Sequence, residues 1–254
     1  GKTITSEDLK AQGMDGIFIA TGVGVANYMG IPGEDLKGVY TASEYLAKYN
    51  LMSPEELAEA LPSLRGKRVA VIGGGNTAID AVRTAIRLDA KQATIVYRRS
   101  EEEMPARAEE IKHAREEGTE FFNLHNPVEY LGDESGYVTA MRLERMELGA
   151  PDESGRRRPV ATGEIITVPV DEVIICIGYS ASTLLAKSMP ELEVNKWGNI
   201  VVDEGKKTSM PDVYAGGDIV RGAATVILAM GDGRRAATAM HQKLSGRIEE
   251  GALV

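Results

Sequence analysis

The sequence predicts an α/β fold in which a parallel sheet carries an antiparallel meander. Three observations lead to this prediction. An apolar strand at residues 67–72 runs directly into three glycines and then into a helical pattern. Strands at residues 94–97 and 119–123 alternate with helices, which gives the β-α-β-α-β order of a nucleotide-binding half. Residues 128–168 alternate apolar and polar side chains between glycine-containing turns, as antiparallel strands do, and residues 173–177 return to the parallel sheet.

The turn after the first of these strands reads G-x-G-x-x-A, from Gly73 to Ala78. Gly73 allows a tight turn, and Gly75 lacks the Cβ that would keep a pyrophosphate away from the backbone. Ala78 lets the following helix, which extends to about residue 88, lie close to the strand. The free N–H groups at the start of that helix attract phosphate. Because the turn lies between a strand and a helix, it predicts a dinucleotide site.

The end of the second strand distinguishes between cofactors. NAD-binding units usually carry Asp or Glu there, which accepts a hydrogen bond from the ribose 2′-hydroxyl. This chain has Arg98 and Arg99, followed by Ser100. Guanidinium groups bind a 2′-phosphate, so we expect NADPH rather than NADH; the alternative is that both arginines only face water. The carboxylates at residues 101–103 are expected to begin a helix or to exclude the wrong cofactor by charge, rather than to act as acid or base.

The remaining elements are predicted from turn residues and periodicity. They are, in chain order, a helix at residues 6–12 capped by Thr5 or Ser6, a strand at 15–20 that ends in Thr21-Gly22, a crossing strand at 39–40, helices at 43–49, 54–60 and 105–117, strands at 200–203 and 213–215, and a helix at 224–244 with Val226, Met230 and Ala237 on its buried face.

Composition limits the classes of function. The hydrophobic content of 43% is that of a globular protein, and the net charge of −9 argues against nucleic acid as a partner. No apolar run reaches the length of a membrane span. The only basic run, residues 156–158, is expected to be a hairpin tip or strand entry rather than a binding patch. The single Cys176 is expected to be an inert core thiol, so we expect no disulfide, no metal site and a reducing cytoplasm.

Several motifs together resemble a known family. They read, in order, DGIFIATG, GGGNTAIDAVRTAIR, YRRSEEEMPAR, IICIGYSA, TSMPDVYAGGD and ATVILAMGDGRRAA. The chain thus resembles the two-dinucleotide flavoprotein oxidoreductases, and within them the NADPH-dependent glutamate synthase small (β) subunit and its relatives. The resemblance implies an FAD-binding domain interrupted by a Rossmann-like NADPH-binding domain. Residues 41–204 would be the NADPH domain, and residues 1–40 and 205–254 would be parts of the FAD domain.

The resemblance also implies cofactor-binding residues. The expected contacts are Gly73, Gly75, Asn76, Thr77 and Ala78 with the pyrophosphate of NADPH, Arg98, Arg99 and Arg107 with its 2′-phosphate, Gly178 on the nicotinamide side, Gly217 and Asp218 at the flavin ribityl chain, Thr225 and Val226 at the helix start by the flavin pyrimidine edge, and Thr21 and Gly22 as further cofactor-binding positions.

The activity implied by the resemblance is hydride transfer from NADPH to FAD, without a catalytic side chain. Electrons would then pass to an iron–sulfur domain and a large catalytic subunit. One alternative is that the chain is an electron-transfer subunit of another iron–sulfur flavoenzyme. The family's first glycine fingerprint and its iron–sulfur cysteines are not in the sequence, so we expect the chain to be a segment of a longer protein. Two alternatives are a catalytically silent NADP-binding module and, with less support, an NADP-dependent dehydrogenase acting directly on a substrate.

Overall fold

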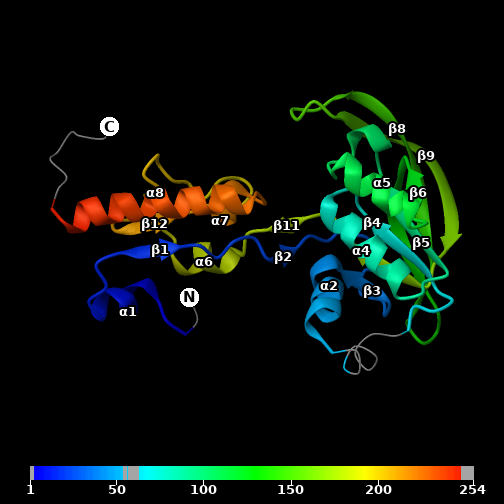
Figure 1. Cartoon of the computed structure of the whole chain (residues 1–254), viewed down its shortest axis with the longest axis horizontal. Coiled ribbons are helices and arrows are strands. Elements are labelled where there is room, and N and C mark those ends of the chain that lie inside the picture. The colour runs from blue at the N-terminus through cyan, green and yellow to red at the C-terminus, as the bar shows by residue number, and fades with distance from the viewer. Residues whose placement is uncertain (1–2, 54–55, 57–62, 247–254) are drawn as a thin grey trace. The chain divides into compact units, whose positions relative to one another are not determined.

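A computed structural model describes residues 3–53, 56 and 63–246. The chain forms two compact units (Figure 1). The central unit is Tyr28–Ile177, and the terminal unit combines Gly1–Asn27 with Gly178–Val254. One unit therefore interrupts the other, and its two ends, Tyr28 and Ile177, each lie earlier in the chain than the expected domain boundaries at residues 41 and 204.

Strand pairing explains where the two compact units divide. Strand β3 (Val39–Thr41) pairs with β10 (Glu172–Ile175) and so belongs to the sheet of the central unit. At the other end, β11 (Tyr179–Ser180) pairs with β2 (Val25–Ala26) in the terminal unit. Ala181, Leu192 and Ile200 are buried in the core of the terminal unit.

The central unit is built on a five-stranded parallel sheet in the order β3-β10-β4-β5-β6. Its strands β4 (Arg68–Ile72), β5 (Gln92–Tyr97) and β6 (Glu120–Asn123) alternate with α4 (Asn76–Arg87), the 3₁₀ helix η1 (Glu101–Glu103) and α5 (Ala108–Glu116). Helix α2 (Ala42–Leu51) follows β3. The strand order reverses between β4 and β10, and ligands of such sheets bind at the carboxyl ends of the strands on either side of a reversal.

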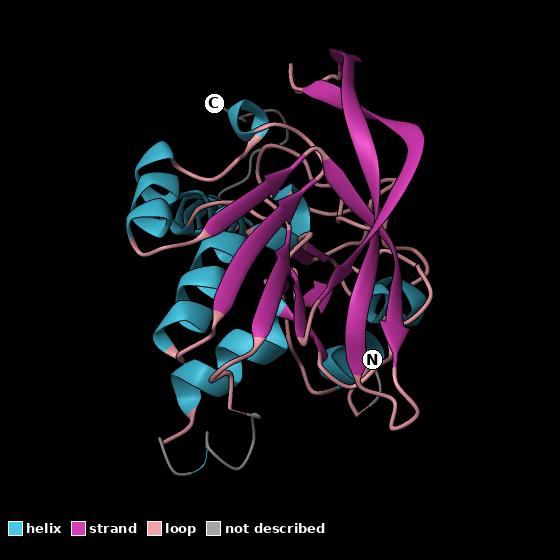
Figure 2. Cartoon of the chain, turned by 90° about the vertical axis from the view of Figure 1, so that its right-hand side faces the viewer, coloured by secondary structure: helices cyan, strands magenta, loops and turns pink. Residues whose placement is uncertain are grey.

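The two faces of this sheet are covered differently (Figure 2). Side chains alternate along each strand, so Val69 and Val71 pack with the helices, while Ala70 and Ile72 face the other way. That second face packs on an antiparallel sheet of β7 (His125–Gly132), β8 (Val138–Pro151) and β9 (Arg157–Pro169). The predicted meander is therefore a separate layer over the parallel sheet.

The terminal unit is built around the parallel pair of β1 (Ile17–Ile19) and β12 (Val213–Ala215). Its helices are α1 (Ser6–Ala11), α6 (Thr183–Ser188), α7 (Asp218–Arg221) and α8 (Val226–Leu244). Thr5 caps α1, as predicted. Among the residues described, no helix combines the length and the apolar character needed to cross a membrane.

Three local predictions differ from the structure. Residues 200–203 form only an isolated bridge, between Ile200 and Val194, instead of a strand. Helix α5 begins at Ala108 rather than near residue 105, because the chain before it forms η1 and then packs on the glycine turn. The predicted helix at residues 54–60 lies, apart from residue 56, outside the residues described.

The predicted buried face of α8 is wrong. Val226 is 75% and Met230 64% exposed, and Ala237 is exposed as well. The buried residues of α8 are Asp232 and Ala236. A Cβ on Gly216 would lie 2.9 Å from the Cβ of Asp232, and one on Gly217 would lie 3.5 Å from that of Ala229. The two glycines thus bring the end of β12 close to α8. The face of α8 that packs there carries small side chains and Asp232.

Burial of Glu172 predicts a pH dependence of stability. Burial raises the pKa of Glu172, even though its ion pair with Lys67 opposes the shift. A carboxyl group with a raised pKa in the folded state stabilises fully at low pH and loses that contribution as the pH rises through the folded pKa. Glu172→Gln is therefore expected to match the wild type in free energy of unfolding near pH 4 and to exceed it near pH 8, measured by urea denaturation. A wild-type advantage at pH 8 would contradict this expectation.

Candidate functional site

The glycine turn lies at the carboxyl end of β4, where the strand order reverses. The Gly73 N–H donates to the Val96 carbonyl (3.0 Å), and the φ angle of Gly73 is +140°. A Cβ at this position would lie 2.3 Å from the carbonyl oxygen of Cys176, which follows the neighbouring β10. Glycine is therefore required at position 73 by the protein's own backbone.

The other two glycines of the turn have different surroundings. A Cβ on Gly74 would lie 2.8 Å from the ring of Tyr97. In contrast, a Cβ on Gly75 would have only the ring of Pro105 near it, at 4.0 Å, and the φ angle of Gly75 is an ordinary −87°. Packing of the protein thus does not require glycine at position 75. Open space at this glycine is what a bound pyrophosphate needs.

Helix α4 begins at this open position without a cap. Gly75 is its N-cap residue, no side chain caps it, and its first turn carries no acidic residue. Within the described parts of the chain, the N–H groups of Asn76 and Thr77 have no hydrogen-bond partner. Ala78 is fully buried against the sheet, as the motif predicts. The start of α4 therefore presents unpaired donors and the positive end of a helix dipole to any anion beside Gly75.

The segment after β5 returns to this turn. We call residues 98–107 the arginine loop. Its Ala106 N–H donates to the Gly74 carbonyl (3.1 Å), and its Arg107 N–H donates to Oδ1 of Asn76 (3.0 Å). Arg107 is exposed, and its side chain has no hydrogen bond or ion pair with any described residue. The same is true of Arg98. Two guanidinium groups are thus available for a ligand.

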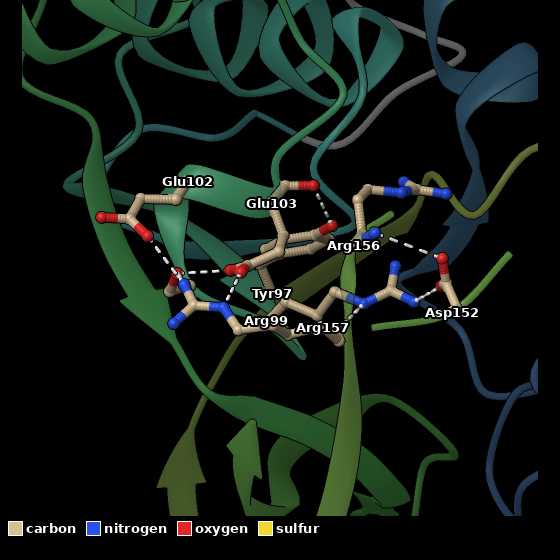
Figure 3. A network of polar contacts seen from close by, with 8 residues as sticks. Tyr97, Arg99, Glu102, Glu103, Asp152, Arg156 and Arg157 are labelled. Carbon is tan, nitrogen blue, oxygen red and sulfur yellow. Dashed lines mark hydrogen bonds and ion pairs between the residues drawn. The ribbon is translucent and has the colours of Figure 1, made fainter. Parts of the chain in front are cut away.

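Arg99 differs from its neighbours, since its side chain is buried and already bound. The guanidinium donates to Oδ2 of Asp152 (2.7 Å) and to the carbonyl of Arg157 (2.8 Å), and Arg99 is 6% exposed. Figure 3 shows these contacts, which join the arginine loop to the end of the β8–β9 hairpin. The expected 2′-phosphate contact of Arg99 would have to compete with this ion pair.

The carboxylates of η1 are held by cations as well. Arg157 pairs with both Glu102 and Glu103, and Arg115 pairs with Glu101. Burial opposes ionisation of Glu103, but the hydrogen bond from Ser100 and the pairing with Arg157 outweigh it and lower its pKa. An ionised, paired carboxylate does not act as a general acid, so the structure favours a structural reading of these residues.

The terminal unit contains the second predicted site. Asp218 follows Gly217 at the end of β12, and its Oδ1 accepts the N–H of Ala224 (3.2 Å). Helix α8 has Thr225 as its N-cap residue without a side-chain cap, and Val226 and Ile227 in its first turn are 75% and 79% exposed. Thr21 and Gly22 lie in the loop after β1, and the Gly178 carbonyl accepts the N–H of Asn27 (3.1 Å). The second site thus combines an uncapped helix start with exposed apolar side chains.

Asp232 supports the turn that carries Asp218, and the sequence analysis missed it. This carboxylate is fully buried and accepts hydrogen bonds from the Gly217 N–H (3.2 Å) and from two nitrogens of Arg221 (2.6 and 2.7 Å). Lys206 lies 3.0 Å from its Oδ1. Hydrogen bonds from Arg221, with further help from Lys206, lower the pKa of Asp232 far below its usual range despite burial. A sequence signal exists, since a carboxylate between Gly231 and Gly233 is unusual inside a helix.

Comparisons with known proteins show the family of the chain. A family model described as pyridine nucleotide-disulphide oxidoreductase matches residues 2–241. Among curated proteins, the chain is 42% identical to the β subunit of the NADP(+)-dependent formate dehydrogenase of Moorella thermoacetica, covering 96% of this chain and 34% of that one. It is 39% identical to the glutamate synthase [NADPH] small chain of Escherichia coli, covering 93% of this chain and 52% of that one.

Solved structures show the same fold at low sequence identity. FprA from Mycobacterium tuberculosis in complex with NADPH matches with a TM-score of 0.77 and 22% identity, over 96% of this chain and 66% of that one. Thioredoxin reductase from T. acidophilum matches with a TM-score of 0.68 and 24% identity, over 91% of this chain and 66% of that one. These structures confirm the predicted fold class, and the family model and curated relatives confirm the resemblance drawn from the motifs.

Proposed function

The chain belongs to the pyridine nucleotide-disulphide oxidoreductase family, and from this premise we propose that it is an NADPH-dependent flavoprotein oxidoreductase module. The central unit binds NADPH, and the terminal unit forms part of an FAD site. The observation that carries the proposal is the uncapped start of α4 beside Gly75, where the protein leaves space that its own packing does not need.

The two phosphate-bearing parts of NADPH, the pyrophosphate and the 2′-phosphate, have residues suited to them. Gly75 would leave room for the pyrophosphate, and the N–H groups of Asn76 and Thr77 would donate to its oxygens, while Gly73 and the buried Ala78 would shape the turn that holds it. Arg98 and Arg107 hold the 2′-phosphate, because both guanidinium groups are exposed and unpaired within the described structure. Arg99 contributes indirectly, since it fixes the backbone between them.

The terminal unit fits a flavin by its chemistry. Asp218 offers a carboxylate for hydroxyl groups of the ribityl chain, next to Gly217. Thr225 and Val226 begin α8, whose positive dipole end favours negative charge on the flavin ring. Gly178, Thr21 and Gly22 lie on loops of the same unit. When bound, the two cofactors supply the chemistry, which is hydride transfer from the nicotinamide to the flavin, so the side chains only bind and orient.

The whole protein's partners belong to the proposal as well. The chain covers about a third to a half of the curated relatives named above, and both are named as a subunit or chain of a larger enzyme. We propose that electrons leave through an iron–sulfur domain and a larger catalytic subunit. The only thiol, Cys176, is buried and burial raises its pKa, which suits a protein of the reducing cytoplasm.

Titration with NADPH and, in parallel, NADH tests the nucleotide site. Arg98→Ala and Arg107→Ala are each expected to weaken NADPH binding about tenfold or more, because each removes a charge-assisted hydrogen bond to phosphate. NADH binding should stay within about twofold of the wild type, because NADH lacks that phosphate. Isothermal titration calorimetry measures both affinities.

Arg87→Ala is the matched control, because Arg87 lies at the opposite end of α4 and its partner Glu117 keeps Arg83. It should change neither affinity. Equal wild-type affinities for NADPH and NADH would overturn the 2′-phosphate assignment. If neither nucleotide binds, the assignment of the glycine turn to the pyrophosphate is overturned.

A further inference from the structure

The arginine loop carries three carboxylates where its proposed ligand carries negative charge. Residues 101–103 are all Glu, and they lie between Arg98 and Arg107. A 2′-phosphate bears a charge between −1 and −2 near neutral pH, by analogy with other phosphate monoesters. Unpaired carboxylates within the same short loop would repel it. Selectivity for NADPH therefore requires that these carboxylates are neutralised by cations from elsewhere.

Arg157 pairs with two of these three carboxylates, and Arg115 pairs with the third. Its Nη2 donates to Oε2 of Glu102 (2.7 Å), and its Nε donates to Oε1 of Glu103. The same guanidinium lies 3.4 Å from the hydroxyl oxygen of Ser100. Arg157 is the first residue of β9 and is separated from Glu103 by 54 positions in the chain. Figure 3 shows its guanidinium between the carboxylates of Glu102 and Glu103.

In a second set of contacts, the arginine belongs to the arginine loop and the acceptors belong to the hairpin between β8 and β9. Residues 152–157 form the hairpin tip. Arg99 of the arginine loop donates to the carboxylate of Asp152 and to the carbonyl of Arg157. Hydrogen bonds within the tip stabilise its turn, since Asp152 accepts from the N–H groups of Ser154 (2.9 Å) and Arg156 (3.3 Å). Loop and tip thus each place an arginine on the other's carboxylates.

We propose that Arg157 is a specificity-determining positioning residue for NADPH: by pairing with Glu102 and Glu103 it offsets part of their negative charge and lets Arg98 and Arg107 act on the 2′-phosphate. This inference rests on the proposed NADPH site. Arg157 need not touch the ligand. It controls the net charge of the arginine loop and fixes its conformation.

If Arg157 only stabilised the fold, its removal would weaken the binding of NADPH and NADH equally. Glu102 is 83% and Arg157 41% exposed in their side chains, so this ion pair adds little to the free energy of folding. The charges of this ion pair act on a bound ligand over a range of one Debye length, which is about 8 Å at physiological ionic strength. The pair with Glu103, which is 6% exposed, contributes to stability, so the charge effect is recognised by a loss of NADPH binding relative to NADH binding, which should weaken with salt.

Titration calorimetry of the whole chain with NADPH and NADH tests the proposal. Arg157→Ala should weaken NADPH binding about tenfold and leave NADH binding within about twofold. Adding Glu102→Gln and Glu103→Gln to this variant should restore most of the NADPH affinity, because the uncompensated charges are then removed. Arg156→Ala is the matched control: it removes the same charge at the hairpin tip from a side chain whose only hydrogen bond to a described residue goes to Ser154, and it should retain the wild-type ratio of affinities.

Other outcomes separate this inference from the proposed function. A wild-type protein without preference for NADPH would refute the proposed function itself. A wild-type preference that Arg157→Ala preserves would refute only the role of Arg157, and so would an equal loss of NADPH and NADH binding. If Arg157→Ala does not fold, Glu102→Gln at the exposed position provides the second test. It should raise the NADPH affinity about threefold, and an unchanged affinity would count against the charge argument.

Discussion

Gly73→Ala is expected to lower the free energy of unfolding by about 4 kcal/mol. Part of this cost is conformational, since alanine is strained at a φ angle of +140°. The rest is steric, because the new Cβ would lie 2.3 Å from the Cys176 carbonyl oxygen and 3.0 Å from its carbon. Both contacts are with the backbone of Cys176, directly after β10, which is paired with β4 and cannot move freely. Urea denaturation followed by circular dichroism measures the loss.

Gly75→Ala is the matched comparison, two residues along the same turn. A Cβ there has 4.0 Å of clearance and an ordinary φ angle, so the free energy of unfolding should change by less than about 1 kcal/mol. Binding of NADPH and of NADH should nevertheless weaken about tenfold or more, because the methyl group occupies the approach of the pyrophosphate. If Gly75→Ala binds both nucleotides normally, the pyrophosphate does not approach this turn as proposed.

Asp232→Ala is expected to cost about 3 kcal/mol of stability, at the lower end of the range for breaking a buried ion pair. The substitution leaves Lys206, whose side chain is 10% exposed, without its carboxylate, and it removes the acceptor of the Gly217 N–H. Arg221 is 30% exposed and reaches solvent, which limits the loss. Because Gly217 precedes Asp218, the substitution should also weaken FAD binding if Asp218 contacts the flavin.

Asp232→Asn separates the charge from the hydrogen bond. It retains an acceptor for Gly217 but not the ion pairs, so its loss of stability should lie between the wild type and Asp232→Ala. Urea denaturation gives the stabilities, and fluorescence titration with FAD gives the binding. A stability of Asp232→Ala within about 1 kcal/mol of the wild type would show that Lys206 and Arg221 find other partners.

Local sequence patterns predicted the elements that depend on short-range chemistry. The apolar strand at residues 67–72, the glycine turn and the start of α4 are all encoded within about twenty residues, and each appears where the sequence analysis placed it. The N-cap of α1 and the alternation of strands and helices along the nucleotide-binding half follow from equally local rules.

Contacts between distant segments decided the rest. Arg99 was expected on the 2′-phosphate, but it is bound to Asp152, 53 residues away, and nothing near Arg99 in the sequence indicates this partner. The boundary between the units also moved, because β3 and β11 each belong to the unit that supplies their hydrogen-bonding partner.

The sequence by itself determined the fold class, the glycine turn and the presence of arginines where a 2′-phosphate would bind. It could do so because backbone geometry and side-chain periodicity are local properties. Only the tertiary structure decided which arginines are available, which face of α8 is buried and how the carboxylates of η1 are neutralised. Those outcomes depend on ion pairs and close packing between segments far apart in the chain, such as Arg157 with Glu103 and Asp232 with Gly217.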